Sequence, residues 1–353
     1  MSYFCVVKQE NIVNGFTQLG KLMRALGASD SWSDFSIGLT QEEYTDLETL
    51  IKEQHHGNGW FTEDNVRKSL SAIGDQLTAS NLEQWLEGHT YTTSPKKVGV
   101  IMAGNIPLVG FHDFLCVLAS GNNALCKLSS TDKTLLPAMA KHLIQFVPEL
   151  SDRIEFTDSR MVGMEAIIAT GSDNSHKYFE QYFGKYPHVF RKNRTSIAIL
   201  DGSESKEELK SLGSDIFSYF GLGCRNVSHL ILPKGYDLDQ FFGAIVDYSG
   251  IINNNKYANN YDYNKAVYLM NLHDLLDNNF ALLRESDELF SPLSMIHYHY
   301  YDAPEDVAGY LAKHEGDLQA IVGKAYLPFG AAQCPQLGDY ADGVDVLEWL
   351  SNL

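Results

Sequence analysis

The sequence lacks a long hydrophobic run: no stretch of about 20 consecutive apolar residues occurs in its 353 residues. Its first residues, MSYFC, contain neither the basic region nor the apolar stretch of a secretory signal. We therefore expect no membrane insertion and a cytoplasmic location. The remaining composition, 44% hydrophobic and 20% charged, is ordinary for a folded globular protein with substantial cores.

Cysteine is scarce, with five residues at positions 5, 116, 126, 224 and 334. An odd number without close spacing argues against a disulfide framework and against a cysteine metal site. His297 and His299 share a strand face and could suggest a metal, but the sequence offers no third ligand within reach. We expect no metal, and free thiols suited to a reducing compartment.

Basic residues are also few, with 27 Lys and Arg against 45 Asp and Glu, a net charge of -18. This charge repels nucleic acids and anionic membrane surfaces, so neither is an expected partner. Lys185, Arg191, Lys192 and Arg194 form the one basic cluster of note. It is either a solvated strand end or a landing place for the phosphates of a nucleotide or of CoA.

The first 93 residues read as helices. Apolar residues recur at helical spacing over residues 12–26, and Thr40 with Glu43 forms a capping box ahead of a second helix. Thr62 opens a third helix. We therefore expect residues 1–93 to form a helical N-terminal region.

From residue 98 the pattern changes to short apolar runs that alternate with amphipathic segments of helical length. This alternation predicts an α/β fold with crossover units and a mostly parallel sheet, first in residues 94–193 and again in residues 194–331. The expected strands are 98–102, 124–128, 166–169, 196–200, 229–232, 266–270, 294–298 and 318–322; the expected helices of the second part are 205–220, 237–248 and 304–313. The Asn- and Tyr-rich stretch 253–261 is expected to be a loop.

Cys224 is the most informative single residue. It lies in the segment FGLGCRNVS (residues 220–228), where Gly221 and Gly223 bare the backbone around the thiol and an apolar strand follows. Glycine can adopt conformations closed to other residues and lets a substrate approach the backbone closely. The segment therefore favours an exposed nucleophile over a small buried cysteine at a strand entrance, the alternative.

Five further segments resemble, in order, landmarks of the aldehyde dehydrogenase superfamily. They are VGVIMAGNIP (98–107), ALCKLSS (124–130), TGS (170–172), ELFSP (288–292) and PFG (328–330). Within the superfamily, CRN (224–226), AQCP (332–335) and DYADGVD (339–345) are similar to the fatty acyl-CoA reductases of the LuxC type.

This resemblance implies an aldehyde dehydrogenase-like fold: two doubly wound α/β domains with a helical N-terminal region and an active site in the crevice between the domains. Residues 94–193 would form the nucleotide-binding domain, together with the helical region 1–93, and residues 194–331 the catalytic domain with Cys224. The tail 332–353, with a strand at 344–350, would be a possible subunit contact, and a homodimer is expected.

The resemblance also implies catalytic roles. Cys224 would be the nucleophile, and Asn105 would hold the oxyanion together with the Cys224 backbone N–H. Acid-forming members of the superfamily carry a water-activating Glu where this chain has Phe190, whose ring would keep water from a thioacyl enzyme. His188, on the same strand face as Phe190, is either a proton shuttle or merely structural.

Nucleotide contacts follow from the same resemblance. Ser130 stands where NAD-preferring relatives often carry a Glu, so NADPH is expected over NADH, with hydroxyls of Ser129, Ser130 and Thr131 near the 2'-phosphate. Lys127 would point at the adenosine ribose, Gly171 and Ser172 would precede the phosphate-facing helix, and Glu288 and Phe290 would hold the nicotinamide ribose and ring.

The implied reaction is reduction of an acyl-CoA by NADPH to the aldehyde, through a thioacyl intermediate on Cys224. Two alternatives stay open at this point. One is an acyltransferase or thioesterase that uses the same acyl-cysteine, and the other is a nucleotide-binding protein without catalysis.

Overall fold

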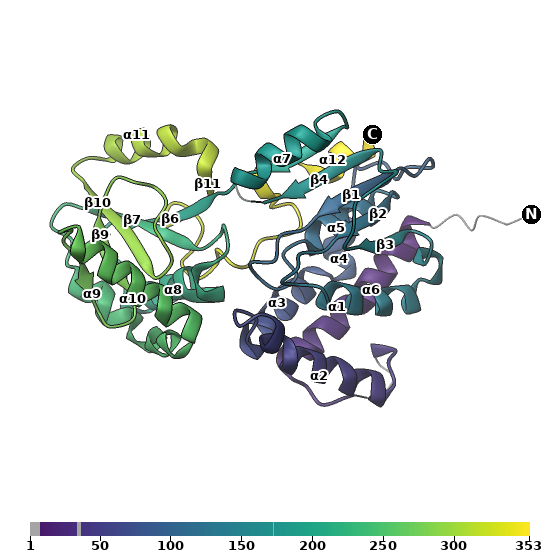
Figure 1. The fold of residues 1–353 in the computed structure, drawn as a ribbon, viewed down its shortest axis with the longest axis horizontal. Coiled ribbons are helices and arrows are strands. Elements are labelled where there is room, and N and C mark those ends of the chain that lie inside the picture. Colours follow the sequence, from purple (N-terminus) through teal and green to yellow (C-terminus); the bar gives the residue numbers. More distant parts are fainter. Residues whose placement is uncertain (1–7, 34–36, 172) are drawn as a thin grey trace, which may run out of the picture. The chain divides into compact units, whose positions relative to one another are not determined.

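The computed structural model describes residues 8–33, 37–171 and 173–353, which fall into two compact units (Figure 1). Unit 1 comprises the described residues up to Lys192 together with Gln336–Leu353, and unit 2 comprises Asn193–Pro335. The C-terminal segment is thus part of the unit that contains the helical N-terminal region.

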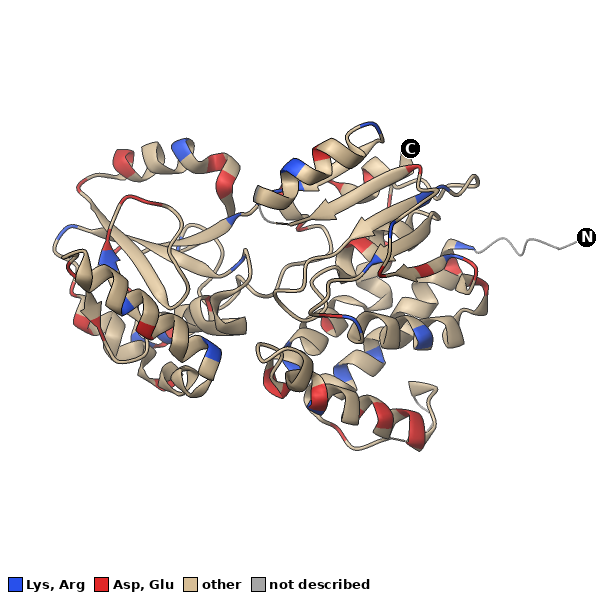
Figure 2. Cartoon of the chain, in the orientation of Figure 1, with Lys and Arg blue, Asp and Glu red and all other residues tan. Residues whose placement is uncertain are grey.

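The N-terminal region is helical, as expected. It contains α1 (Gln9–Ala28), α2 (Gln41–Gly57), α3 (Glu63–Gln76) and α4 (Ala79–Leu86). The predicted capping box is present, because the Thr40 side chain accepts from the Glu43 N–H and the Glu43 carboxylate accepts from the Thr40 N–H. Thr62 caps α3 as predicted. The charged face of α2 carries a series of acidic residues, visible in red in Figure 2.

Unit 1 contains a parallel sheet whose strands, among the described residues, number five in the order β3-β2-β1-β4-β5. The strands are β1 (Lys97–Ile101), β2 (Asn123–Lys127), β3 (Ile154–Thr157), β4 (Ala166–Thr170) and β5 (His188–Arg191). The helices that connect them are α5 (Phe111–Ala119), α6 (Leu135–Phe146) and α7 (Asp173–Phe183).

The strand order changes direction between β1 and β4, which are neighbours in the sheet. Because crossovers are right-handed, α7 lies on the opposite face from α5 and α6, as Figure 1 shows. The carboxyl ends of β1 and β4 therefore form a topological switch point, the place where open α/β sheets bind their ligands.

Unit 2 contains a second sheet, with six strands in the described part of the chain, in the order β11-β6-β7-β10-β9-β8. The strands are β6 (Thr195–Ile199), β7 (Val227–Pro233), β8 (Leu276–Asp277), β9 (Leu282–Glu285), β10 (Met295–Tyr301) and β11 (Leu318–Val322), all parallel to their neighbours except β8. Its α-helices are α8 (Lys206–Phe217), α9 (Leu238–Ile245), α10 (Asn255–Met270) and α11 (Pro304–His314).

Two predictions in unit 2 are wrong. The expected strand at 266–270 and most of the expected loop at 253–261 belong to the single helix α10. Asn254 starts this helix, because its side chain accepts from two backbone N–H groups of the first turn. Tyr257, Tyr261 and Asn264 are buried on one face. Large polar-tipped side chains thus form the buried stripe, which a search for purely apolar periodicity misses.

The C-terminal prediction is also wrong, since the expected strand at 344–350 is the helix α12 (Val346–Ser351). Asp345 caps it by accepting from the Glu348 N–H. Val346, Leu347 and Leu350 are buried, and the Leu350 carbonyl accepts from Asn122 Nδ2 at 3.2 Å. The apolar residues of this segment are therefore buried inside unit 1.

Over the described ranges, no helix is both long and apolar enough to cross a bilayer. The apolar residues of α5, buried nearly all round the helix, belong instead to the core of unit 1.

Candidate active site

Cys224 lies on an exposed loop of unit 2 with an unusual backbone. The loop begins in the 3-10 helix η3 (Ser218–Gly221), where Tyr219, Phe220 and Gly221 have φ values of 52°, 60° and 79°. Left-handed φ values are costly for aromatic residues, so the surroundings must hold this conformation. Cys224 itself is exposed, as expected for a nucleophile.

Asn226 holds this loop. Its buried side chain donates through Nδ2 to the carbonyls of Asp215, Ile216 and Ser218 at 3.0, 3.2 and 2.9 Å. Its Oδ1 accepts from the Gly223 N–H at 2.8 Å. One side chain thus ties the end of α8 to the residues on both sides of Cys224, so the thiol is presented on a firmly held loop.

Asp215 joins the same loop to the segment that follows β11. Its fully buried carboxylate accepts from the backbone N–H groups of Gly330 and Ala332 at 2.6 and 2.9 Å. Arg225 Nη1 donates to the Ala332 carbonyl at 3.4 Å. Sequence reasoning missed Asp215 and used Asn226 only as part of a family marker. A signal existed, since Asp215 lies between Leu212 and Ile216 on the buried face of α8.

The Glu288–Phe290 segment lies between β9 and β10. Because β7 and β10 are parallel and in register, the chain enters both strands at the same edge of the sheet. A Cβ on Gly221 would lie 3.6 Å from the Leu293 side chain, so the segment before β10 reaches the Cys224 loop. The Glu288 carboxylate is 70% exposed and pairs with Arg284 at 3.2 Å, and Phe290 is also exposed.

In unit 1, the loops after β1 and β2 interlock at the carboxyl edge of the sheet. Thr131 Oγ1 donates to the Gly104 carbonyl at 2.9 Å and lies 2.9 Å from Ser129 Oγ. A Cβ on Gly104 would lie 2.3 to 2.4 Å from these two oxygens, so only glycine fits there. Asn105 follows directly and is exposed. Two of the three hydroxyls expected near a 2'-phosphate are thus already bonded within the chain.

Lys127 and Ser130 belong to the same edge. Lys127 is the last residue of β2, as expected, and Ser130 is exposed three residues beyond it. Because β1 and β2 are parallel neighbours, both side chains lie at the edge to which Asn105 belongs.

Gly171 directly follows β4, beside the switch point. A Cβ at this position would lie 2.9 Å from Ser175 and 3.1 Å from the Phe179 ring, so a side chain would push α7 away. Helix α7 begins at Asp173, so Gly171 precedes this helix as expected. Ser172 lies outside the described residues. A helix N-terminus at a switch point favours a phosphate group.

His188 and Phe190 share a face of β5, as expected. Their rings stack at 4.0 Å with an interplanar angle of 14°. The Phe190 ring also packs against the rings of His176 and Phe179 of α7, with ring centroids 5.9 and 5.8 Å apart. His188 Nδ1 donates to the Tyr186 carbonyl at 2.8 Å. Both side chains therefore take part in the packing of β5 against α7.

The basic cluster does not form one exposed surface. Arg191 is buried and pairs with Asp113 of α5, with the Arg191 Nη1 and Asp113 Oδ2 atoms 2.5 Å apart. Arg194 Nη1 donates to the Leu318 carbonyl at 3.0 Å. Arg191, at least, therefore has a structural role and is not an exposed phosphate-binding residue.

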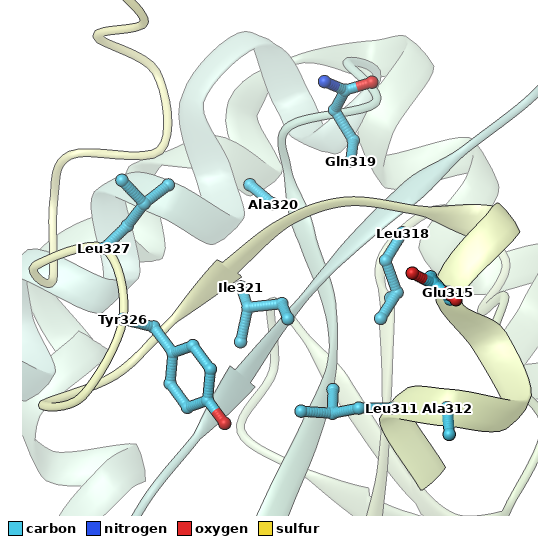
Figure 3. A pocket seen from close by; sticks show the side chains of 9 residues that line it. All are labelled: Leu311, Ala312, Glu315, Leu318, Gln319, Ala320, Ile321, Tyr326 and Leu327. Carbon is cyan, nitrogen blue, oxygen red and sulfur yellow. The ribbon is translucent and has the colours of Figure 1, made fainter. Parts of the chain in front are cut away.

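A cavity of about 620 Å³ lies elsewhere in unit 2, beside the edge strand β11 (Figure 3). Figure 3 shows side chains from α11, β11 and the following turn around it: Leu311, Leu318, Ile321, Tyr326 and Leu327, with Glu315 at its rim. None of the residues predicted for the active site lines it. In the part of the chain that the structure covers, no group of three or more His, Cys, Asp or Glu is arranged to hold a metal ion.

Comparison with known proteins identifies the fold. No protein-family description and no curated protein sequence matches this chain. Among solved structures, the bifunctional proline utilization A protein matches 90% of this chain with a TM-score of 0.64 at 12% identity. The chain spans 36% of that protein's length.

Two aldehyde dehydrogenase structures match over a larger share of their own length. The NAD+ complex of the enzyme from Bacillus cereus has a TM-score of 0.61 at 12% identity, with 91% of this chain and 73% of the other covered. Aldehyde dehydrogenase C from Pseudomonas syringae, with NAD+ and octanal, has a TM-score of 0.60 at 10% identity, with 90% and 72% covered. The chain therefore has the aldehyde dehydrogenase-like fold of two α/β domains that the sequence predicted.

Proposed function

We propose that this chain reduces acyl-CoA thioesters to aldehydes, with NADPH as the reductant and a thioacyl intermediate on Cys224. The observation that carries the proposal is the Cys224 loop, where an exposed thiol stands on a strained backbone held by Asn226 and Asp215. Strain of this kind is common where a chain must present a reacting group. Two of the similar solved structures are complexes with NAD+, which supports a nicotinamide cofactor.

In the proposed overall reaction, acyl-CoA, NADPH and a proton give aldehyde, CoA and NADP+. The Cys224 thiolate attacks the thioester carbon, a bond from sulfur to the acyl carbon forms, and the CoA thiolate leaves and takes up a proton. NADPH, when bound, supplies the hydride that reduces the acyl group. The resulting thiohemiacetal on Cys224 collapses, which releases the aldehyde and regenerates the thiolate.

The residues of unit 1 fit a dinucleotide. Gly104 and Gly171 lie at the carboxyl edge of β1 and β4, and a Cβ at either position would collide with neighbouring side chains. Such bare backbone beside a helix N-terminus suits a pyrophosphate. Lys127 and Ser130 would hold the adenosine ribose. In unit 2, Glu288 and Phe290 would hold the nicotinamide ribose and ring, since both side chains are exposed.

Phe190 supports aldehyde rather than acid as the product. Its aromatic ring stands where acid-forming relatives carry a carboxylate, and its neighbours on β5 supply none. A thioacyl enzyme without a base for water persists until hydride arrives. Asn105 and His188 stay proposed as oxyanion donor and proton shuttle.

The first prediction concerns Cys224. Incubation with a panel of acyl-CoAs, without nucleotide, should add the acyl mass to the wild-type protein, read by intact mass spectrometry. Cys224→Ala should form no adduct and lose aldehyde production by about 10³-fold or more, while it still binds NADPH.

The matched control is Cys334→Ala, because Cys334 is the other exposed cysteine in unit 2. This variant should still form the adduct. An acyl adduct that persists in Cys224→Ala would rule out the assignment. Acyl transfer to water without any NADPH consumption would instead identify a thioesterase.

A further inference from the structure

Four histidines of unit 2 gather beside the Glu288 segment, although they are far apart in the sequence. His229 of β7 lies opposite His297 of β10 in the strand register, and His299 follows on the same face of β10. His229 and His297 are fully buried. His314 of α11 completes the group through Tyr310, whose ring lies 4.5 Å from that of His314 and 4.4 Å from that of His299.

Two of these rings converge on one backbone atom. His229 Nδ1 and His297 Nδ1 lie 3.0 and 2.9 Å from the Glu288 carbonyl oxygen. A carbonyl oxygen only accepts hydrogen bonds and has two lone pairs, so it can accept from both rings. Each ring must therefore carry a proton on Nδ1.

The second ring nitrogen of His229 faces another histidine of the cluster. His229 Nε2 lies 2.7 Å from His299 Nδ1. Since a neutral His229 with its proton on Nδ1 can only accept at Nε2, His299 must donate there and set the tautomer of His229. Burial, and then the neighbouring His299, lower the pKa of His229 to about 3, and burial also lowers the pKa of His297.

Other charged groups face the cluster from each neighbouring element. They are Asp287 and Glu288 from the loop, Arg284 from β9, and Lys313 from α11. Tyr310 Oη lies 3.4 Å from the Asp287 carbonyl, on the side of α11. Two hydrogen bonds of the cluster converge on the Glu288 carbonyl oxygen, which only accepts. The cluster can therefore hold the main chain at this point.

The other groups of Glu288 are also held. Its N–H donates to Ser286 Oγ at 3.2 Å, and one carboxylate oxygen pairs with Arg284. The main chain is thus fixed from the buried side, while the carboxylate points outward and the second oxygen can accept from a ligand.

We infer that His229 and His297 are positioning residues that hold the Glu288 carbonyl, so that the Glu288–Phe290 segment meets the nicotinamide ribose, with His299 fixing the tautomer of His229. This inference rests on the proposed function, because it takes the nucleotide as the ligand of Glu288.

The test compares His297→Leu with His297→Asn. Leucine fills a similar space but donates no hydrogen bond, whereas the Asn amide nitrogen replaces Nδ1. His297→Leu should weaken NADPH binding roughly tenfold, and His297→Asn should restore it to within about twofold of the wild type. Acylation by acyl-CoA without nucleotide should be unchanged in both, because Cys224 does not depend on this hydrogen bond. A general loss of structure would slow acylation as well.

A second measurement uses the wild-type protein, so it does not depend on whether a variant folds. In ¹⁵N-labelled wild type, NMR correlation spectra should show the ring protons of His229 and His297 on Nδ1. Protons on Nε2, or a His297→Leu variant that binds NADPH as the wild type does, would overturn the inference. A wild type that shows both Nδ1 protons but binds no nucleotide would instead overturn the proposed function and leave the hydrogen bonds to Glu288 standing.

Discussion

At the scale of single residues, the proposed preference for NADPH rests on Ser130. It is exposed beyond β2, and the neighbouring Ser129 and Thr131 hydroxyls already bond to each other. A 2'-phosphate at this place would meet no carboxylate, and the 2'-hydroxyl of NADH would find no carboxylate to accept its hydrogen bond.

We therefore predict that the wild type prefers NADPH and that Ser130→Glu reverses this preference. The new carboxylate would repel the phosphate, so kcat/KM with NADPH should fall roughly 10- to 100-fold. Ser130→Gln is the matched control, since it has nearly the same size without the charge, and it should keep the preference for NADPH. Steady-state kinetics with both nucleotides decide the matter. A wild type that favours NADH would contradict the cofactor assignment but leave the chemistry at Cys224 untouched.

At the scale of elements, the Cys224 loop depends on α8 and on the segment after β11. Asn226 is the link, because four of its hydrogen bonds join α8 to the loop. The Ser196 hydroxyl adds a fifth contact, from β6 to the Cys224 carbonyl at 3.0 Å. Because the buried Asn226 side chain makes all four of these hydrogen bonds, it fixes the position of the Cys224 loop.

Asn226→Asp should therefore destabilise unit 2 and slow the reaction of Cys224. Aspartate keeps the acceptor for Gly223 but places a carboxylate oxygen against three carbonyls, so we expect a loss of about 2–4 kcal/mol in the free energy of unfolding. Urea unfolding and the rate of acyl-adduct formation measure the two effects. Asn259→Asp, the same substitution on an exposed position of helix α10, should change stability by no more than about 0.5 kcal/mol. Equal urea midpoints for Asn226→Asp and the wild type would refute the role of this side chain.

At the scale of the whole molecule, the two units should respond differently to acid. The pKa of His229 is lowered from 6.5 to about 3, so its contribution to stability is complete above pH 6.5 and is lost as the pH falls toward 3. Burial also lowers the pKa values of three other histidines of unit 2, namely His297, His299 and His314. The raised pKa of Glu204 opposes this trend in unit 2.

In unit 1, the pKa shifts of two buried groups have opposite effects on stability as the pH falls. Burial lowers the pKa of His142 but raises that of Asp132 from 3.8 to about 6. The cost of the buried Asp132 charge is therefore present above pH 6 and is relieved as the pH falls toward 3.8, which offsets the effect of His142. Acidification from pH 7 to 5 should weaken unit 2 more than unit 1.

Tryptophan makes this prediction measurable, because all four tryptophans, at positions 32, 60, 85 and 349, belong to unit 1. Urea unfolding followed by tryptophan emission reports on unit 1, whereas far-UV circular dichroism reports on both units. At pH 5 the dichroism should begin to change at a lower urea concentration than the emission. We expect the free energy of unfolding of unit 2 to fall by an amount on the order of a few kcal/mol between pH 7 and pH 5. Coincident transitions that shift equally between pH 7 and 5 would contradict it.

The sequence by itself determined the local features of this protein. Short apolar runs predicted β1, β2 and β4 of unit 1, and the capping residues Thr40 and Thr62 predicted where α2 and α3 begin. The Gly-flanked Cys224 predicted an exposed thiol. These features depend on residues within a few positions of one another, so the spacing of side chains along the chain is enough to reveal them.

Only the tertiary structure decided which distant groups meet. In the sequence, Arg191 belongs to a basic cluster of the kind found on protein surfaces. In the structure it is buried and pairs with Asp113 of α5. The Glu288 carbonyl receives hydrogen bonds from His229, 59 positions earlier in the chain, and from His297. Strand pairing between β7 and β10 sets the rings side by side, and periodicity along one strand shows which face a residue lies on but not which residue lies opposite. For that reason the thiol was predictable, whereas the side chains that hold its loop and the Glu288 segment were not.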